Sequence, residues 1–136
     1  MKVVVDTNIL VSSISKKSSL RWVFNAFINE KFTLCVTTEI LAEYEEILQR
    51  FFGNELASIV LQIIENAVNV EFVTTYYAWM LIKSDPDDNK FVDCAIAANA
   101  KYIISNDKHF KALNEVEFPQ MEVIGIGEFL KTILEE

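Results

Sequence analysis

Acidic side chains follow two short apolar segments of this sequence. Asp6 comes directly after "KVVV", and Asp107 comes two residues after "KYIIS". Runs of β-branched apolar residues are typical of strands that are buried on both faces, and open α/β sheets bind ligands at the carboxyl ends of their strands. An Asp after a strand is also a common turn former or helix cap. Because two such residues occur, with Asn8 close to the first, the pattern indicates a carboxylate site at one edge of a sheet.

The segment "DPDDNKFVDCAIAA" adds four more aspartates at the expected start of a helix. Successive helical residues are about 100° apart, which places Asp88 in the middle of the apolar stripe and Asp93 about 140° away from it. We therefore expect Asp88 to point inward and Asp93 to face solvent, with Asp85 capping a helix that begins at Pro86. An inward carboxylate is costly unless it is paired or binds a cation. The dipole and free N–H groups of the first helical turn offer Asp88 a structural alternative.

The segment "TEILAEYEEILQRF" supplies further acidic residues on a second predicted helix. Glu43 borders one side of its apolar stripe, and Glu45 borders the other side about as closely. Helical spacing alone therefore leaves both residues open as site or surface acids.

The elements that must position these side chains follow from hydrophobic periodicity. Apolar β-branched runs predict strands at residues 2–5, 33–37, 70–73, 101–105 and 121–124. Apolar residues at 3.6-residue spacing predict helices across residues 40–51, 56–68 and 91–98. Strands that alternate with helices indicate a parallel sheet with helical crossovers. We expect a three-layer α/β/α fold around a central parallel sheet, built as a single domain over residues 1–136.

Composition narrows the classes of function. The net charge of -8 argues against a broad basic face for gripping duplex nucleic acid. No apolar run approaches the roughly eighteen residues needed to cross a membrane, so we expect a cytoplasmic protein with no membrane segment. Cys35 and Cys94 lie in apolar surroundings and are expected to be small core residues.

Four segments of the chain, taken together, resemble a PIN-domain protein: "VVVDTNILVS", "TTEILAEYEEIL", "DPDDNKFVDCAIAANAKYIISNDKHF" and "VIGIGEFL". Their order and spacing are most similar to prokaryotic toxins of toxin–antitoxin pairs that are related to VapC-type ribonucleases. The resemblance implies an α/β/α fold and a carboxylate site that binds a divalent metal ion and cuts single-stranded RNA. It also implies a cognate antitoxin protein as partner.

The resemblance assigns roles to individual residues. It favours Glu43 over Glu45, and it places Asn106 where the family usually has a small residue. Oxygen ligands select Mg²⁺ or Mn²⁺. The implied catalytic and metal-binding acids are Asp6, Glu43, Asp88 and Asp107, with Asn8 and Ser105 as hydrogen-bonding residues that orient them.

An early aromatic group and the family's habit of dimerising predict a homodimer. Trp22, Phe24 and Phe27 would form either its surface or part of the core. His109, the only histidine, is expected to be incidental, because the implied chemistry does not call for a general base.

Two other functions compete with the nuclease. A phosphotransferase of the haloacid-dehalogenase type needs a second acid two residues after the first, where this chain has Asn8. The main alternative is a catalytically silent PIN-like module that docks a partner protein or RNA. A nuclease assay with Mn²⁺ against a chelator separates it from the enzyme.

Overall fold

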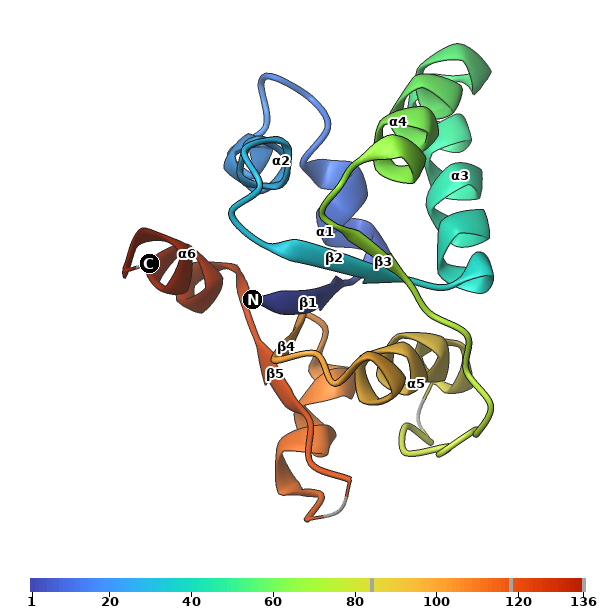
Figure 1. Cartoon of the computed structure of the whole chain (residues 1–136), viewed down its shortest axis with the longest axis vertical. Coiled ribbons are helices and arrows are strands. Elements are labelled where there is room, and N and C mark those ends of the chain that lie inside the picture. The colour runs from blue at the N-terminus through green and yellow to red at the C-terminus, as the bar shows by residue number, and fades with distance from the viewer. Residues whose placement is uncertain (84, 118, 136) are drawn as a thin grey trace.

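A five-stranded parallel sheet forms the centre of the molecule (Figure 1). The computed structural model describes residues 1–83, 85–117 and 119–135. The strands lie in the order β3-β2-β1-β4-β5, and every neighbouring pair is parallel. Their bounds are β1 Lys2–Val5, β2 Thr33–Val36, β3 Val70–Phe72, β4 Tyr102–Ile104 and β5 Glu122–Ile124. Each lies within the range expected from the apolar runs.

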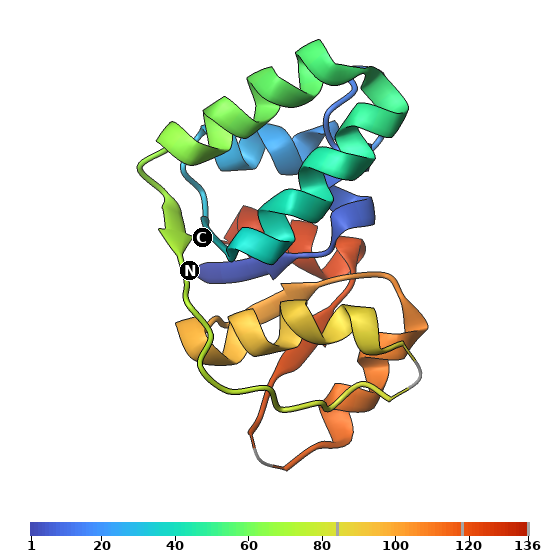
Figure 2. The same ribbon diagram turned by 90° about the vertical axis from the view of Figure 1, so that its right-hand side faces the viewer.

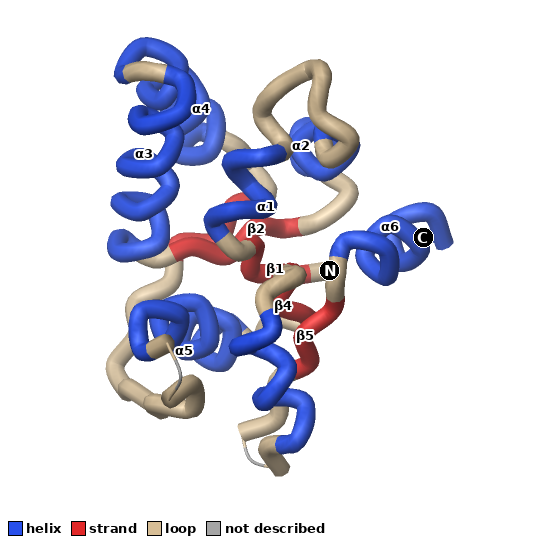
Figure 3. Tube along the Cα trace, turned by 180° about the vertical axis from the view of Figure 1, so that it is seen from behind, coloured by secondary structure: helices blue, strands red, loops and turns tan. Residues whose placement is uncertain are grey.

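Helices cover both faces of this sheet, so the expected three-layer α/β/α fold is confirmed. Figure 3 shows the sheet between a layer that contains α1 to α4 and a layer that contains α5. The α-helices are α1 Thr7–Ser12, α2 Arg21–Ile28, α3 Thr38–Phe52, α4 Asn54–Asn66, α5 Asn89–Ala98 and α6 Ile126–Glu135, and the 3-10 helices are η1 Pro86–Asp88 and η2 Lys108–Glu115.

The central strands β2, β1 and β4 are mostly buried because helices pack on both of their faces. Val3, Val4 and Val5 of β1 are fully buried, and so are Ile103 and Ile104 of β4. This burial explains why the strands appear in the sequence as continuous apolar runs instead of alternating ones. The two cysteines are buried and free, in agreement with their expected place in the core.

The early aromatic residues belong mainly to the core. Phe24 and Phe27 are buried, and Trp22 is half-buried with its ring centroid 5.6 Å from that of Phe129 in α6. These side chains therefore do not supply the free apolar surface on which the predicted homodimer was based. The ring that meets Trp22 comes from Phe129, more than 100 positions later in the sequence, so this contact could not be read from the local sequence.

A buried tyrosine connects α3 to the end of β1. Tyr44 is fully buried, and its hydroxyl donates a hydrogen bond to the backbone carbonyl of Val5. Glu43 precedes Tyr44 on α3, and Asp6 follows Val5 in the chain. This contact therefore fixes the helix that carries one predicted site acid against the strand that carries another.

None of the helices within residues 1–83, 85–117 and 119–135 combines the length and the apolar character that a membrane span requires.

Replacement of Tyr44 by Phe should lower the free energy of unfolding by about 1 kcal/mol or more, because it leaves a buried carbonyl without its partner. Urea unfolding of both proteins measures the difference. Tyr76→Phe is the matched control, since the Tyr76 side chain is 93% exposed and the same atom is removed there without burial. A Tyr44→Phe variant as stable as the control would show that the contact does not fasten α3 to β1.

Candidate functional site

Ser105 joins two of the predicted acids at the carboxyl edge of the sheet. The backbone N–H of Asp6 donates to the carbonyl of Ile104 at 3.0 Å, so β1 and β4 end side by side. Ser105 Oγ then donates to Asp6 Oδ2 at 2.9 Å and accepts from the backbone N–H of Asp107 at 3.0 Å. One hydroxyl group therefore holds Asp6 and the start of the Asp107 turn together.

Asp6 and Asp107 differ in their relation to the helices that follow them. Asp107 caps η2, because its Oδ1 accepts from the backbone N–H of His109 at 2.9 Å. Asp6 precedes α1 without a side-chain capping bond, and it is 7% exposed. Burial is the main reason why the pKa of Asp6 is raised, and the hydrogen bond from Ser105 partly opposes it. The Asp107 side chain therefore caps a helix, as the alternative interpretation expected, whereas the Asp6 side chain does not.

Glu43 reaches the same region from α3. Its Oε1 lies 2.7 Å from Lys90 Nζ, and its Oε2 accepts a hydrogen bond from Thr7 Oγ1. Glu45 is exposed on the other side of the helix. The structure thus separates the two glutamates that helical spacing left equivalent.

Asp88 ends η1, immediately before α5, and points inward as the helical spacing predicts. Its side chain is 14% exposed, and its Oδ2 is buried without a hydrogen-bond partner among the described residues. The pKa of Asp88 is raised to about 6, chiefly by burial and then by the negative charges of Asp85, Asp6 and Asp107. These charges act on one another, so the acids that lie far apart in the sequence form one electrostatic group.

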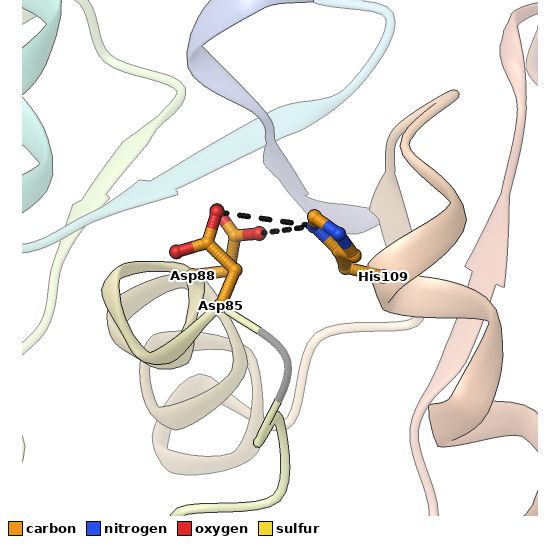
Figure 4. A group of neighbouring side chains, drawn as sticks. All are labelled: Asp85, Asp88 and His109. Carbon is orange, nitrogen blue, oxygen red and sulfur yellow. Dashed lines mark ion pairs between the residues drawn. The ribbon is translucent and has the colours of Figure 1, made fainter.

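Asp85 and His109 also lie at this site, where sequence reasoning did not place them. Figure 4 shows Asp85 and Asp88, from the turn before α5, facing His109 of η2. His109 Nδ1 is 3.2 Å from Asp107 Oδ1, 3.7 Å from Asp88 Oδ2 and 3.8 Å from Asp85 Oδ2. His109 therefore lies beside the acids, as its spacing from Asp107 could have indicated, and the expectation that it has no catalytic role stays a prediction.

Asp85 occupies the position before η1 but makes no side-chain capping bond, contrary to expectation. Its carboxylate turns toward His109 instead. One ligand atom from each of Asp85, Asp88 and His109 lies within 4.8 Å of the others, which is close enough for all three to hold one metal ion.

Asp93 does not face solvent as predicted. Its Oδ1 accepts a hydrogen bond from the backbone N–H of Trp79 at 3.1 Å, and its half-burial raises its pKa. The loop after β3 passes alongside α5 (Figure 2) and contacts the helix face that the helical wheel leaves open. Asn89 fastens the same loop, since its side chain bonds both the N–H and the carbonyl of Ile82 at 2.9 Å.

Asn8 and Asn106 lie at the rim of the site. Both line a hollow of about 310 Å³ beside Asp6 and Asp107, and the Asn8 side chain is exposed. Asn106 Oδ1 accepts from the backbone N–H of Ile126 at 3.1 Å. The residue that stands in place of the family's usual small one therefore fastens the start of α6.

The residues present fit a hard divalent cation. Asp88 Oδ2 is a buried acceptor that no described group satisfies, and a buried carboxylate is costly unless a cation or a proton neutralises it. Asp6, Glu43 and Asp107 lie within electrostatic range of one another or of Asp88, but among the described residues the ligand atoms that already lie within 4.8 Å of one another belong to Asp85, Asp88 and His109. Carboxylate oxygens are ligands preferred by Mg²⁺ and Mn²⁺.

Comparisons with known proteins place this geometry in a family. A sequence model described as the PIN domain matches residues 2–109. A search of curated proteins found no significant match. Among solved structures, VapBC2 from Rickettsia felis, bound to a DNA fragment from its promoter, has a TM-score of 0.63 at 20% identity and covers 92% of this chain and 98% of its own.

Two further structures share the fold. VapC20 from Mycobacterium tuberculosis, described as a sarcin-ricin loop cleaving toxin, has a TM-score of 0.60 at 17% identity, over 81% of this chain and 93% of its own. The PIN domain endonuclease Utp24 has a TM-score of 0.54 at 19% identity, over 92% of this chain and 84% of its own. At these identities the likeness concerns the fold alone.

Substitution of Asp88 by Asn should stabilise the metal-free protein at neutral pH by about 1 to 2 kcal/mol. The pKa of Asp88 rises from 3.8 to about 6 on folding. Between about pH 4 and 6 the folded protein therefore binds more protons than the unfolded chain, and the free energy of unfolding falls as the pH rises. Denaturant unfolding at several pH values in EDTA should show a shallower fall for Asp88→Asn than for wild type.

The control for this experiment is Asp87→Asn, which removes a neighbouring but exposed carboxylate. It should follow the wild-type pH dependence. Equal slopes for all three proteins would mean that folding does not raise the pKa of Asp88 in the metal-free protein.

Proposed function

The chain belongs to the PIN-domain family, and we propose that it is a metal-dependent endoribonuclease that cleaves single-stranded RNA. We propose further that residues 1–136 form a single nuclease domain, and that it is the toxin of a toxin–antitoxin pair acting in the cytoplasm. The observation that carries the proposal is Asp88 Oδ2, a buried and unsatisfied carboxylate oxygen among other acids. A silent scaffold gains nothing from such an atom, whereas a metal ion satisfies it.

Mg²⁺ or Mn²⁺ would be held by Asp6, Glu43, Asp88 and Asp107. When bound, such an ion supplies an activated water molecule and neutralises charge that develops on the phosphate. Asp85 and His109 adjoin Asp88 and could take part in the same coordination.

The surrounding side chains orient the acids. Ser105 fixes Asp6 and the Asp107 turn through its two hydrogen bonds, and Thr7 fixes Glu43. Such hydrogen bonds set the direction of ligand oxygens before a metal binds. Asn8 is exposed at the rim of the hollow, where its amide can meet the substrate.

RNA and an antitoxin are proposed as partners from the site chemistry and the family. VapC20 is described as a sarcin-ricin loop cleaving toxin, and VapBC2 was solved bound to a DNA fragment from its promoter. The antitoxin partner is proposed from the resemblance to toxins of toxin–antitoxin pairs. The net charge of -8 suits an RNA strand held locally through a metal ion better than one held along a broad basic face.

The competing proposal is a catalytically silent PIN-like module that docks a protein or RNA. The acids brought to one sheet edge favour the enzyme, because like charges held together destabilise a fold that makes no use of them. An RNA cleavage assay with a divalent metal ion or with EDTA separates the enzyme from the silent module.

Incubation with a mixed RNA pool should give discrete products with Mg²⁺ or Mn²⁺ and none with EDTA. Asp88→Asn should abolish cleavage, because it removes a proposed metal ligand. Asp93→Asn should cleave like wild type, since the Asn amide oxygen can still accept from the N–H of Trp79. Cleavage that persists in EDTA, or that survives Asp88→Asn, would remove the basis for the metal-dependent nuclease.

The homodimer remains a prediction, but the surface expected to form the dimer contact is a different one. Because Phe24 and Phe27 are buried, the apolar contact must come from other residues, such as Leu130 and Leu134 of α6, which are 36% and 75% exposed. Light scattering at tens of micromolar should give twice the 15.6 kDa mass of one chain. A monomer mass at that concentration would contradict the prediction.

A further inference from the structure

Lys90 lies inside the candidate site, on α5 two residues after Asp88. Its Nζ is 2.7 Å from Glu43 Oε1, and its side chain is only 14% exposed. The same Nζ donates to the backbone carbonyl of Asp87 at 3.0 Å and lies 5.3 Å from the centre of the Phe91 ring. These contacts fix the ammonium group against Glu43 more firmly than an ordinary surface ion pair, whose partners are free to separate into water.

Both oxygens of Glu43 are therefore already engaged. Oε2 accepts from Thr7 Oγ1, and Oε1 is paired with Lys90. Asp88 provides the contrast, because its Oδ2 has no hydrogen-bond partner among the described residues. Within one group of acids, Glu43 is thus paired closely with a lysine ammonium, whereas the nearest side-chain nitrogen printed for Asp88 Oδ2 is His109 Nδ1 at 3.7 Å.

We propose that Lys90 is an internal counter-ion that occupies, on Glu43 Oε1, the position that a divalent cation bound by Glu43 would take. The inference rests on the proposed function, because it concerns the metal that the nuclease would use. Two cations at contact distance from one oxygen repel each other strongly. Metal binding through Glu43 must therefore move the Lys90 ammonium away, and Lys90 lowers metal affinity while it stabilises the metal-free site.

Lys90 is on this account a positioning residue that acts through Glu43. It keeps the carboxylate directed into the site when no metal is bound, and it raises the metal concentration at which the site fills. A purely structural ion pair behaves differently, because its loss destabilises the metal-free and the metal-loaded protein equally and leaves metal affinity unchanged.

The test compares wild type, Lys90→Met and Lys90→Arg as whole chains without RNA. Methionine keeps an apolar stem beside Phe91 and removes the charge, whereas arginine keeps the charge. Titration calorimetry with MnCl₂ should give about tenfold tighter binding for Lys90→Met, a typical size for coupling between two sites, and near wild-type binding for Lys90→Arg. Thermal melts should show a lower Tm for metal-free Lys90→Met and a larger rise in Tm on adding Mn²⁺.

Lys101→Met is the matched control. Lys101 also stacks over the aromatic residue that follows it, with its Nζ 5.4 Å from the Tyr102 ring centre, but it is exposed and makes no ion pair with any described residue. It precedes β4 and so lies at the opposite edge of the sheet from the site. Its removal tests the effect of net charge alone and should leave the Mn²⁺ affinity close to that of wild type.

The outcomes are distinguishable. Unchanged or weaker Mn²⁺ binding by Lys90→Met, beside measurable binding by wild type, overturns the counter-ion and leaves the proposed function standing. Mn²⁺ binding that is measurable for Lys90→Met but not for wild type also supports the counter-ion, because it means that Lys90 prevents the site from filling. If neither protein binds Mn²⁺, the proposed metal-dependent function fails, and the counter-ion fails with it.

Discussion

Repulsion between carboxylates at the carboxyl edge of the sheet is the constraint on which the rest of this site depends. Asp6 is 7% exposed, Asp88 is 14% exposed, and the pKa of each is raised by burial and by the other acids. Such a group is stable only if its surroundings supply hydrogen bonds or positive charge. Ser105, Thr7, Lys90 and His109 supply them, and each comes from a different part of the chain.

The parallel topology is what makes this crowding unavoidable. β1 and β4 are neighbours although almost a hundred residues separate them, and the bond from Asp6 N to Ile104 O ends them at the same level. Tyr44 then fixes α3 to the last carbonyl of β1, which brings Glu43 to the same edge. The acids therefore meet as a direct result of packing in the core, and the site exists only once the sheet has formed.

The parts that could be predicted from the sequence are those governed by periodicity. Continuous apolar runs mark buried parallel strands, so the strands were found close to their true positions, and helical spacing alone directs Asp88 inward. Glu43 could be separated from Glu45 only by resemblance to the family, because both border the same stripe. The structure supplies the missing physical reason, namely that α1 and α5 bring Thr7 and Lys90 to one side of α3.

The predictions that were wrong, for Asp93 and Asp85, concerned side chains that contact distant segments of the chain. Asp93 lies on the polar side of its helix, but the loop after β3 folds along that side and uses the carboxylate as an acceptor. Asp85 has the position of a cap and makes no capping bond, because η2 brings His109 within reach of it. A helical wheel describes one element at a time, so it contains no information about which loop or side chain will arrive from elsewhere.

The hydrogen bond between Asn106 and the start of α6 restricts which residue can stand at position 125. Gly125 lies so close that a Cβ atom added there would be 2.8 Å from Asn106 Oδ1, which is closer than real Cβ contacts occur. A side chain at position 125 would therefore force the Asn106 amide to shift away from its hydrogen bond with the N–H of Ile126. In related chains, positions 106 and 125 should covary. Where position 106 is asparagine, position 125 should be glycine. Where position 106 holds a smaller residue, position 125 should accept other residues.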